Sequence, residues 1–140
     1  MSEPGLGLRF TVTIDGHGSL GDWTKCDGLV VEWDIYEYKE GGNNAYIHRL
    51  PGRAKYQNIK LTRPVTPETA QVIGWLKVVD ARVERTTARI AVLDAAGEEV
   101  AAWTLDGVYP VRWSGPTLDV AGAQAAFEVL ELAHNGFLLV

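Results

Sequence analysis

Alternating apolar and polar positions dominate this chain and predict β-strands along most of its length. In residues 8–14 every second side chain is apolar, namely Leu8, Phe10, Val12 and Ile14. A period of two is typical of a strand with one buried face. Residues 29–38 repeat the pattern, with one apolar face made of Leu29, Val31, Trp33 and Ile35. A third strand is expected over residues 56–62, with Ile59 and Leu61 facing inward. These patterns predict an antiparallel sheet with one solvated side.

The period changes after Pro64 and predicts the only substantial helix, over residues 67–80. Thr66 is placed to cap it, Pro67 takes the first helical position, and Glu68 follows in the first turn, where the helix dipole favours an acid. Four apolar residues then recur at helical spacing, namely Val72, Ile73, Leu76 and Val79. This apolar stripe must cover a hydrophobic surface elsewhere in the fold.

Strand patterns return in the second half of the chain. Residues 88–93 and 98–105 flank a short turn and predict a hairpin. Asp106-Gly107 predicts a further two-residue turn, and Pro110 confines the next strand, residues 108–113, to an edge or a bulge. A last strand is expected over residues 124–133. Seven strands and one helix in a single domain, residues 1–140, predict a mainly β fold, an antiparallel β-sandwich or barrel with one capping helix.

One segment, residues 39–55, fits no element and is expected to be a long inter-strand loop. Ordinary hairpin loops have about two to five residues, and longer loops in compact domains are usually functional. The segment mixes apolar Tyr46, Ile47 and Leu50 with basic Arg49 and Arg53. This mixture suits contact with another surface better than contact with solvent, so the segment predicts a protein–protein interface.

Charge and composition exclude several classes of protein. The chain has 13 Lys and Arg against 18 Asp and Glu, a net charge of −5, with no basic run, which argues against specific nucleic-acid binding. No uncharged apolar run is long enough to span a membrane, so we expect no membrane insertion. The first residues lack the pattern of a signal peptide, which predicts synthesis in the cytoplasm. The single cysteine, Cys26, is interpreted as a small, part-buried apolar residue.

The motifs that carry chemistry in other proteins are incomplete here. Residues 16–21 match the dinucleotide fingerprint Gly-x-Gly-x-x-Gly, but no helix begins inside the motif, so we interpret it as a glycine-rich hairpin turn. The histidines lie in separate turns or loops and share no metal-ligand spacing; they are His17, His48 and His134. Glu128 and Glu131 fall on opposite faces of the last predicted strand. We therefore expect no catalytic residue, no cofactor, no metal and no enzymatic activity. A nucleotide-binding enzyme and a small-ligand-binding β-barrel module are the alternatives of another class.

Five tryptophans are more than a chain of this size usually carries. Trp33, Trp75 and Trp103 lie in predicted elements and are expected to pack in the core or at an interface, whereas Trp23 and Trp113 border loops.

A series of short motifs, in order along residues 9–136, resembles the tail-tube proteins of contractile phage tails and phage-tail-like injection systems. The series includes Glu37-Tyr38, Gly41-Gly42-Asn43-Asn44, Leu50-Pro51-Gly52-Arg53, the Trp75-Leu76 helix, Val108–Pro116 and Leu130–Gly136. The resemblance implies a small β-barrel or sandwich with one helix, similar to the ring protein of type VI secretion. It also implies a structural role, in which homohexameric rings stack into the inner tube inside a contractile sheath.

The resemblance further implies partners and a site. The partners are other copies of the chain, the sheath, the spike or baseplate and the tape-measure protein, and the lumen passes cargo in a particle assembled in the bacterial cytoplasm. In the family the segment after the second strand reaches an adjacent ring or subunit. Ring-stacking residues are therefore expected at Gly41, Gly42, Asn43, Asn44, Tyr46, Ile47, Arg49, Leu50 and Arg53. A baseplate-proximal ring that initiates the tube on the spike is the alternative within the same family.

Overall fold

The computed structural model describes residues 8–39, 47–119, 121 and 126–138, and for residues 36, 38–39 and 47–51 it describes the backbone only. Within these residues there are nine strands and one helix. The elements are β1 (Arg9–Ile14), β2 (Gly18–Trp23), β3 (Lys25–Asp27), β4 (Val31–Lys39), β5 (Ile47–Tyr56), β6 (Ile59–Pro64), α1 (Thr69–Ala81), β7 (Thr86–Leu93), β8 (Glu99–Ser114) and β9 (Phe127–Ala133).

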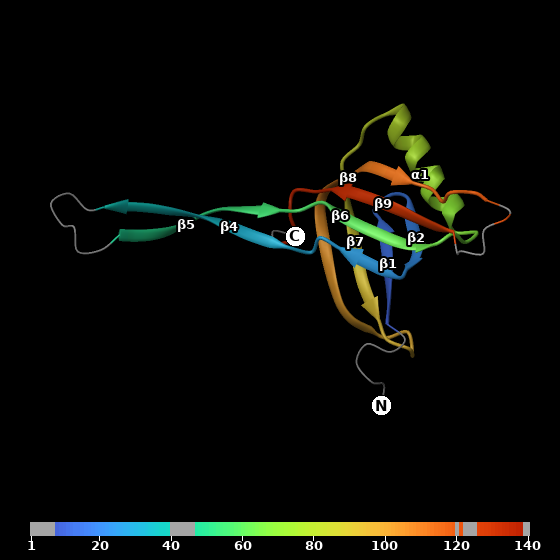
Figure 1. Cartoon of the computed structure of the whole chain (residues 1–140), viewed down its shortest axis with the longest axis horizontal. Coiled ribbons are helices and arrows are strands. Elements are labelled where there is room, and N and C mark those ends of the chain that lie inside the picture. The colour runs from blue at the N-terminus through green and yellow to red at the C-terminus, as the bar shows by residue number, and fades with distance from the viewer. Residues whose placement is uncertain (1–7, 40–46, 120, 122–125, 139–140) are drawn as a thin grey trace.

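Seven strands form one curved antiparallel sheet, in the order β2-β1-β7-β8-β9-β6-β3. Strands β4 and β5 pair only with each other and project from the body as a long hairpin (Figure 1). The predicted mainly β, antiparallel fold with one helix is confirmed. The sheet does not close into a barrel, because its two outermost strands, β2 and β3, form no ladder with each other. Only Thr24 separates them in the chain, which leaves no room for a turn that would fold one back on the other.

The first hairpin shows why strand β2 was not predicted. His17 donates its backbone N–H to the Ile14 carbonyl at 3.0 Å, and Gly16 has a φ of +83°, so the glycine-rich motif begins in the predicted hairpin turn, although its residues 18–21 belong to β2. Strand β2 follows directly and pairs with β1, from Ile14 opposite Gly18 to Phe10 opposite Trp23. Its glycines and short polar residues weaken the intrinsic strand signal, and only pairing with β1 makes it a strand.

The predicted turn at Asp106-Gly107 is wrong. These residues lie inside β8, a continuous strand of 16 residues. The first part of β8 pairs with β7 and the last part with β9, so the strand passes from one neighbour to another instead of turning back. The C-terminal segment satisfies the backbone here, since Asp106 N–H donates to the Gly136 carbonyl at 2.9 Å. The expected bulge at Pro110 is confirmed by a register shift between Pro110 and Arg112.

The helix begins two residues later than predicted. Residues 66–68 form a turn in which the Thr66 hydroxyl accepts the Glu68 N–H at 3.2 Å, and regular helix starts at Thr69. Val72 and Trp75 are its buried residues, and the helix covers one side of the sheet (Figure 1).

The core lies between the sheet and this helix. Its fully or almost fully buried members are Val12, Ile14, Leu20, Trp23, Ile59, Leu61, Val72, Trp75, Ala88, Ile90, Leu105, Val108, Leu130 and Leu132. The predicted inward positions are confirmed for Val12, Ile14, Ile59 and Leu61, whereas Leu8, which lies just before β1, is exposed. Trp23, expected at a loop border, is fully buried at the end of β2. In contrast, Trp33 and Ile35, predicted to lie on a buried face, are exposed, because β4 leaves the body.

Candidate assembly surface

The β4–β5 hairpin, which we call the arm, is the most prominent surface feature of the chain. Its two strands run antiparallel from Val31 opposite Tyr56 to Lys39 opposite Ile47. Nine residues of β4 at about 3.3 Å each give the arm a length of roughly 30 Å. A two-stranded ribbon without a third strand or a covering helix is marginally stable in water. An arm of this kind is stabilised when another surface covers it.

Charged residues along the arm are matched across its two strands. Lys55 Nζ lies 2.8 Å from Asp34 Oδ1. Lys55 also stands opposite Glu32, and Arg49 stands opposite Glu37 in the register. Opposite charges at facing positions stabilise a ribbon of this kind by a few tenths of a kcal/mol to about 1 kcal/mol per pair. These pairs favour the observed register.

The apolar residues of β4 have no such cover. Trp33 and Ile35 are 52% and 57% exposed, and they share one face of the strand because they are two residues apart. The register shift between them adds the extra residue to β5, so β4 stays regular. Adjacent large apolar side chains on a projecting ribbon mark a surface that another protein covers.

The predicted site residues fall on this arm or beyond the described residues. Gly41, Gly42, Asn43, Asn44 and Tyr46 lie outside them. Ile47, Arg49 and Leu50 belong to the backbone of β5, and Arg53 is exposed on the same strand.

The long loop expected over residues 39–55 is therefore wrong for residues 47–55, which form β5. Pro51 and Gly52 are residue types that usually disfavour the interior of a strand. They are tolerated because β5 is an edge strand with a bulge, where a missing N–H donor costs little.

An aromatic cluster joins the base of the arm to the C-terminal segment. The Tyr56 ring meets the His134 and Phe137 rings edge-on, with centroid separations of 5.5 Å and 5.1 Å. His134 Nδ1 accepts the Gly136 N–H at 3.0 Å, so its other nitrogen, Nε2, is the donor to the Gln57 carbonyl at 2.8 Å. The cluster holds the body end of β5 in place.

A buried ion pair lies at the opposite end of β6. Arg63 and Glu128 are 1% and 0% exposed and face each other in the β6–β9 register. Arg63 Nε lies 2.9 Å from Glu128 Oε2. Arg63 Nη1 also donates to the carbonyls of Leu20 and Asp22 on β2, at 2.6 Å and 3.2 Å. The guanidinium stacks 3.9 Å from the centre of the Trp23 ring. One side chain thus ties β6 to both β9 and β2.

Glu128 completes this network on the helix side. It accepts a short hydrogen bond from the Thr69 hydroxyl and another from Trp113 Nε1 at 3.0 Å. Sequence reasoning placed Glu128 and Glu131 on opposite faces of the strand, which is confirmed, but it missed the pair with Arg63. The alternating pattern could have revealed this pair. Arg63 takes the next inward position after Ile59 and Leu61 in β6, and Glu128 takes the inward position before Leu130 and Leu132 in β9.

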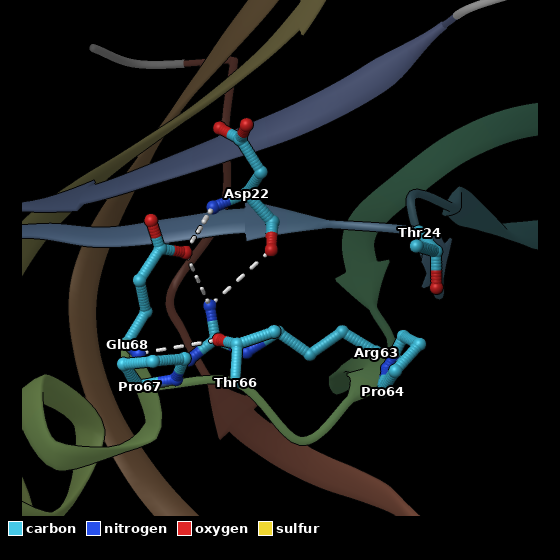
Figure 2. A pocket seen from close by; sticks show the side chains of 7 residues that line it. All are labelled: Asp22, Thr24, Arg63, Pro64, Thr66, Pro67 and Glu68. Atoms are coloured by element: carbon cyan, nitrogen blue, oxygen red, sulfur yellow. Dashed lines mark hydrogen bonds and ion pairs between the residues drawn. The ribbon is translucent and has the colours of Figure 1, made fainter. Parts of the chain in front are cut away.

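An open depression of about 540 Å³ lies beside this network, and Figure 2 shows the residues that line it. They are Asp22, Thr24, Arg63, Pro64, Thr66, Pro67 and Glu68. Glu68 Oε2 lies 3.5 Å from Arg63 Nη1 and accepts the Asp22 N–H at 3.2 Å. The side chains of Asp22 and Glu68 remain about half exposed at the rim.

The described residues hold no grouping of three or more His, Cys, Asp or Glu that could bind a metal ion. Within the same residues no helix is long and apolar enough to cross a membrane. Cys26 is half-buried, as interpreted from the sequence, and burial together with the charge of Asp27 raises the pKa of its thiol to about 11. A thiol with so high a pKa is a poor nucleophile at neutral pH.

Comparison with known protein families identifies the chain. The family described as T4-like virus tail tube protein gp19 matches residues 7–138, nearly the whole sequence. The chain belongs to this family. It is a tail tube protein, a structural component of phage tails and tail-like contractile particles. No curated protein matches the sequence.

Solved structures share the fold of this tail tube protein. A chain of the extended sheath–tube complex of the extracellular contractile injection system PVC has 23% identity and a TM-score of 0.75, over 93% of this chain and 86% of that one. A chain of the anti-feeding prophage baseplate has 23% identity and a TM-score of 0.67, over 97% and 95%. Hcp1 from Salmonella typhimurium has 16% identity and a TM-score of 0.52, over 92% and 83%. The expected likeness to the type VI ring protein is confirmed at the level of the fold.

Proposed function

We propose that this tail tube protein forms hexameric rings that stack into the inner tube of a contractile phage tail or a phage-tail-like injection system. The observation that carries the proposal is the arm, a ribbon of roughly 30 Å with Trp33 and Ile35 exposed on one face. Membership of the tail tube family supports assembly into a tube, and the arm offers a surface that a neighbouring subunit would cover.

The edges of the sheet support assembly into rings. The outermost strands, β2 and β3, are at the two ends of the seven-stranded order. The backbone of β2 is already engaged within the chain, since Arg63 donates to the Leu20 and Asp22 carbonyls and Glu68 accepts the Asp22 N–H, so β3 is the edge that can pair with another chain. Contacts between one edge and a different surface of the next subunit are head-to-tail, and they close into a ring when the rotation between subunits permits. Six copies joined in this way would leave the arm free for contacts between rings.

The remaining expectations become part of the proposal. Contacts between stacked rings involve Gly41, Gly42, Asn43, Asn44, Tyr46, Ile47, Arg49, Leu50 and Arg53. The ring sits inside the sheath, contacts the baseplate or spike and the tape-measure protein, and passes cargo through its lumen. Assembly takes place in the bacterial cytoplasm, and the protein has no enzymatic activity. A net charge of −5 would reduce retention of nucleic acid or acidic cargo.

A baseplate-proximal ring that initiates the tube on the spike is a second candidate. A chain of the anti-feeding prophage baseplate matches over 97% of this chain and 95% of that one, but a chain of the PVC sheath/tube terminator matches over 99% and 96% with a higher TM-score, 0.76 against 0.67, so coverage supports a specialised ring without selecting the baseplate. An initiator would form single rings that bind the spike and stack only in the presence of a separate tube subunit.

Negative-stain electron microscopy of the purified protein tests the proposal. The native chain should form rings, and tubes at higher concentration. Replacing residues 34–53 with Asn-Gly would join Trp33 to Ala54, which face each other in the register, through a two-residue turn. This short-arm variant should stay folded but lose stacking. Ala96→Lys, at another exposed turn, is the control and should stack normally. A native chain that stays monomeric at every concentration, with or without sheath and spike partners, would overturn the proposal.

A further inference from the structure

We infer that Asn135 is a site of self-deamidation, at which the folded chain converts its own side-chain amide into a carboxylate in a single turnover. The inference goes beyond the proposed function, because it concerns a covalent change within one chain and not assembly. Asn135-Gly136 is the only Asn-Gly pair in the sequence, and it follows β9 at the base of the arm (Figure 1). Asn135 is exposed, so water can reach its amide.

The nucleophile of this reaction is the backbone nitrogen of Gly136. In deamidation the nitrogen that follows an asparagine attacks the side-chain carbon Cγ and closes a succinimide ring. Glycine leaves that nitrogen unhindered, because it has no Cβ. The fold needs glycine at this position, since Gly136 has a φ of +129° and an added Cβ would lie 2.6 Å from the Tyr56 ring. The packing at the base of the arm thus keeps the residue that makes Asn135 reactive.

His134 is placed as the base. Its Nδ1 accepts the Gly136 N–H at 3.0 Å, and this is the proton that must leave before the nitrogen can attack. The Gln57 carbonyl lies 2.8 Å from Nε2 and accepts its hydrogen, which leaves the lone pair on Nδ1. A base that contacts the proton to be removed and is itself oriented by a third group is the arrangement of a general-base site.

Arg85 and β8 hold the amide that is attacked. Arg85 Nη1 donates to Asn135 Oδ1 at 3.5 Å, where negative charge develops when Cγ is attacked. The Asn135 N–H donates to the Asp106 carbonyl at 2.8 Å, and the Gly136 carbonyl accepts the Asp106 N–H at 2.9 Å. The side-chain amide also packs against Gly107, which has no room for a Cβ. The reacting groups are therefore positioned before the reaction begins.

The reaction balances with water as its only co-reactant. The Gly136 nitrogen gives its proton to His134 Nδ1 and forms a bond to Asn135 Cγ. The negative charge on Oδ1 faces Arg85, and its collapse breaks the bond from Cγ to Nδ2. Nδ2 leaves as ammonia, with the proton returned to it through solvent. Water then opens the succinimide at one of its two carbonyls and gives aspartate or isoaspartate.

Both products change the base of the arm. Each lowers the net charge of the chain by one and places a carboxylate beside Arg85. Isoaspartate also adds a methylene to the main chain between the two hydrogen bonds that join residues 135 and 136 to Asp106. The modification can therefore be followed by charge, by mass and by chromatography.

Mass spectrometry of the purified full chain after incubation at pH 8 tests the inference. Asn135 is the only asparagine in residues 113–140, the last tryptic peptide, which should gain about 1 Da as NH₂ is replaced by OH. The folded chain should react at least as fast as the chain unfolded in guanidinium chloride, since only folding places His134 and Arg85. Asn135→Gln, whose longer side chain closes the ring poorly, should stay unmodified. A slower reaction in the folded chain than in the unfolded one would overturn the inference.

Three variants separate the roles of the groups around the amide. His134→Phe keeps a ring against Tyr56 but has no base, so it should slow the reaction by about tenfold or more. Arg85→Gln, at an exposed position, should slow it several-fold. Arg82→Gln is the matched control at another exposed arginine and should react like the native chain. Far-ultraviolet circular dichroism checks that all three variants are folded.

The pH dependence of the native chain identifies the base without a variant. Tyr56 packs on the His134 ring from the arm, Arg85 contacts Asn135 from the segment before β7, and Asp106 contacts it from β8 through its backbone. Histidine ordinarily loses its proton between about pH 5 and 8. With His134 as the base, the rate should therefore be nearly constant from pH 8 to pH 9, whereas proton removal by hydroxide would raise it about tenfold. A tenfold rise in the native chain, or native rates in both His134→Phe and Arg85→Gln, would overturn the inference.

Discussion

Glu128→Ala tests the buried network that links the sheet to the helix. Glu128 is fully buried and accepts hydrogen bonds from Arg63, Thr69 and Trp113. Removing it takes from Arg63, itself 1% exposed, its buried partner and leaves only the half-exposed Glu68 carboxylate 3.5 Å away, which sets the cost near the lower end of the about 3–5 kcal/mol for breaking a buried ion pair. Each neutral donor that loses its acceptor adds about 1 kcal/mol. The expected loss of about 5 kcal/mol or more is a large part of the 5–15 kcal/mol by which domains are typically stable.

The double variant Arg63→Met/Glu128→Leu is the matched control, because it removes both charges and keeps most of the apolar volume. Replacing a buried ion pair with apolar residues is often neutral or stabilising, so this variant should recover part of the stability lost in Glu128→Ala. Thr69 and Trp113 still lack an acceptor in it, and the Leu20 and Asp22 carbonyls lose their donor, which leaves a residual cost of about 2–4 kcal/mol.

Urea unfolding followed by tryptophan fluorescence measures the free energy of unfolding, since Trp23 and Trp75 are buried in the folded chain. The short-arm variant is the appropriate background, because assembly would raise the apparent stability by mass action. A loss below about 1 kcal/mol for Glu128→Ala, smaller than the cost of one unpaired buried charge, would refute the reasoning. So would a double variant less stable than the single one.

Further predictions concern three single residues, Cys26, Gly74 and Gly28. Because burial raises the pKa of the Cys26 thiol from 9.0 to about 11, alkylation by iodoacetamide at pH 8 should be roughly a hundredfold slower in the folded chain than in urea, as read by mass spectrometry. The folded-state pKa lies above the unfolded one, so the contribution of this thiol to stability is complete below pH 9 and is lost between about pH 9 and 11. The native chain should therefore lose more stability than Cys26→Ala between pH 8 and pH 10.5. The same change in stability in both chains would contradict this. Gly74→Ala should raise the free energy of unfolding by about 0.5–1 kcal/mol, because the site is an exposed helix position with nothing within 4 Å of the new Cβ. Gly28→Ala should lower it instead and reduce the melting temperature, since Gly28 has a φ of +100° and the new Cβ would lie 2.0 Å from the Asn58 carbonyl oxygen.

Much of the fold was predictable from local pattern. The strands over residues 9–14, 59–64 and 86–93, the helix and the hairpin between β7 and β8 each carry their own periodicity or turn residues. The errors have a common cause in pairing between distant segments. Asp106-Gly107 has the local chemistry of a turn, but β9 and Gly136 supply the backbone partners that keep β8 extended.

The candidate site divides in the same way. Residues 39–55 stood out in the sequence as an interface because apolar and basic side chains are mixed there. The structure shows that much of this segment belongs to the arm, where Trp33 and Ile35 are exposed because β4 leaves the body. A two-residue periodicity identifies the two faces of a strand but does not indicate which face another element will cover. The depression was not predictable, because its lining comes from β2, β6 and the turn before α1.

Short-range periodicity and motifs in a fixed order were enough to assign the mainly β class, the helix and the tail tube family. Which apolar faces are covered and which stay exposed depends on the tertiary structure. The residues 31–35 and 59–61 alternate in the same manner, yet Ile59 and Leu61 are buried while Trp33 and Ile35 are exposed. The physical reason is that burial requires an opposing surface. For β6 that surface lies within the same chain, and for the arm we propose that the neighbouring subunit provides it.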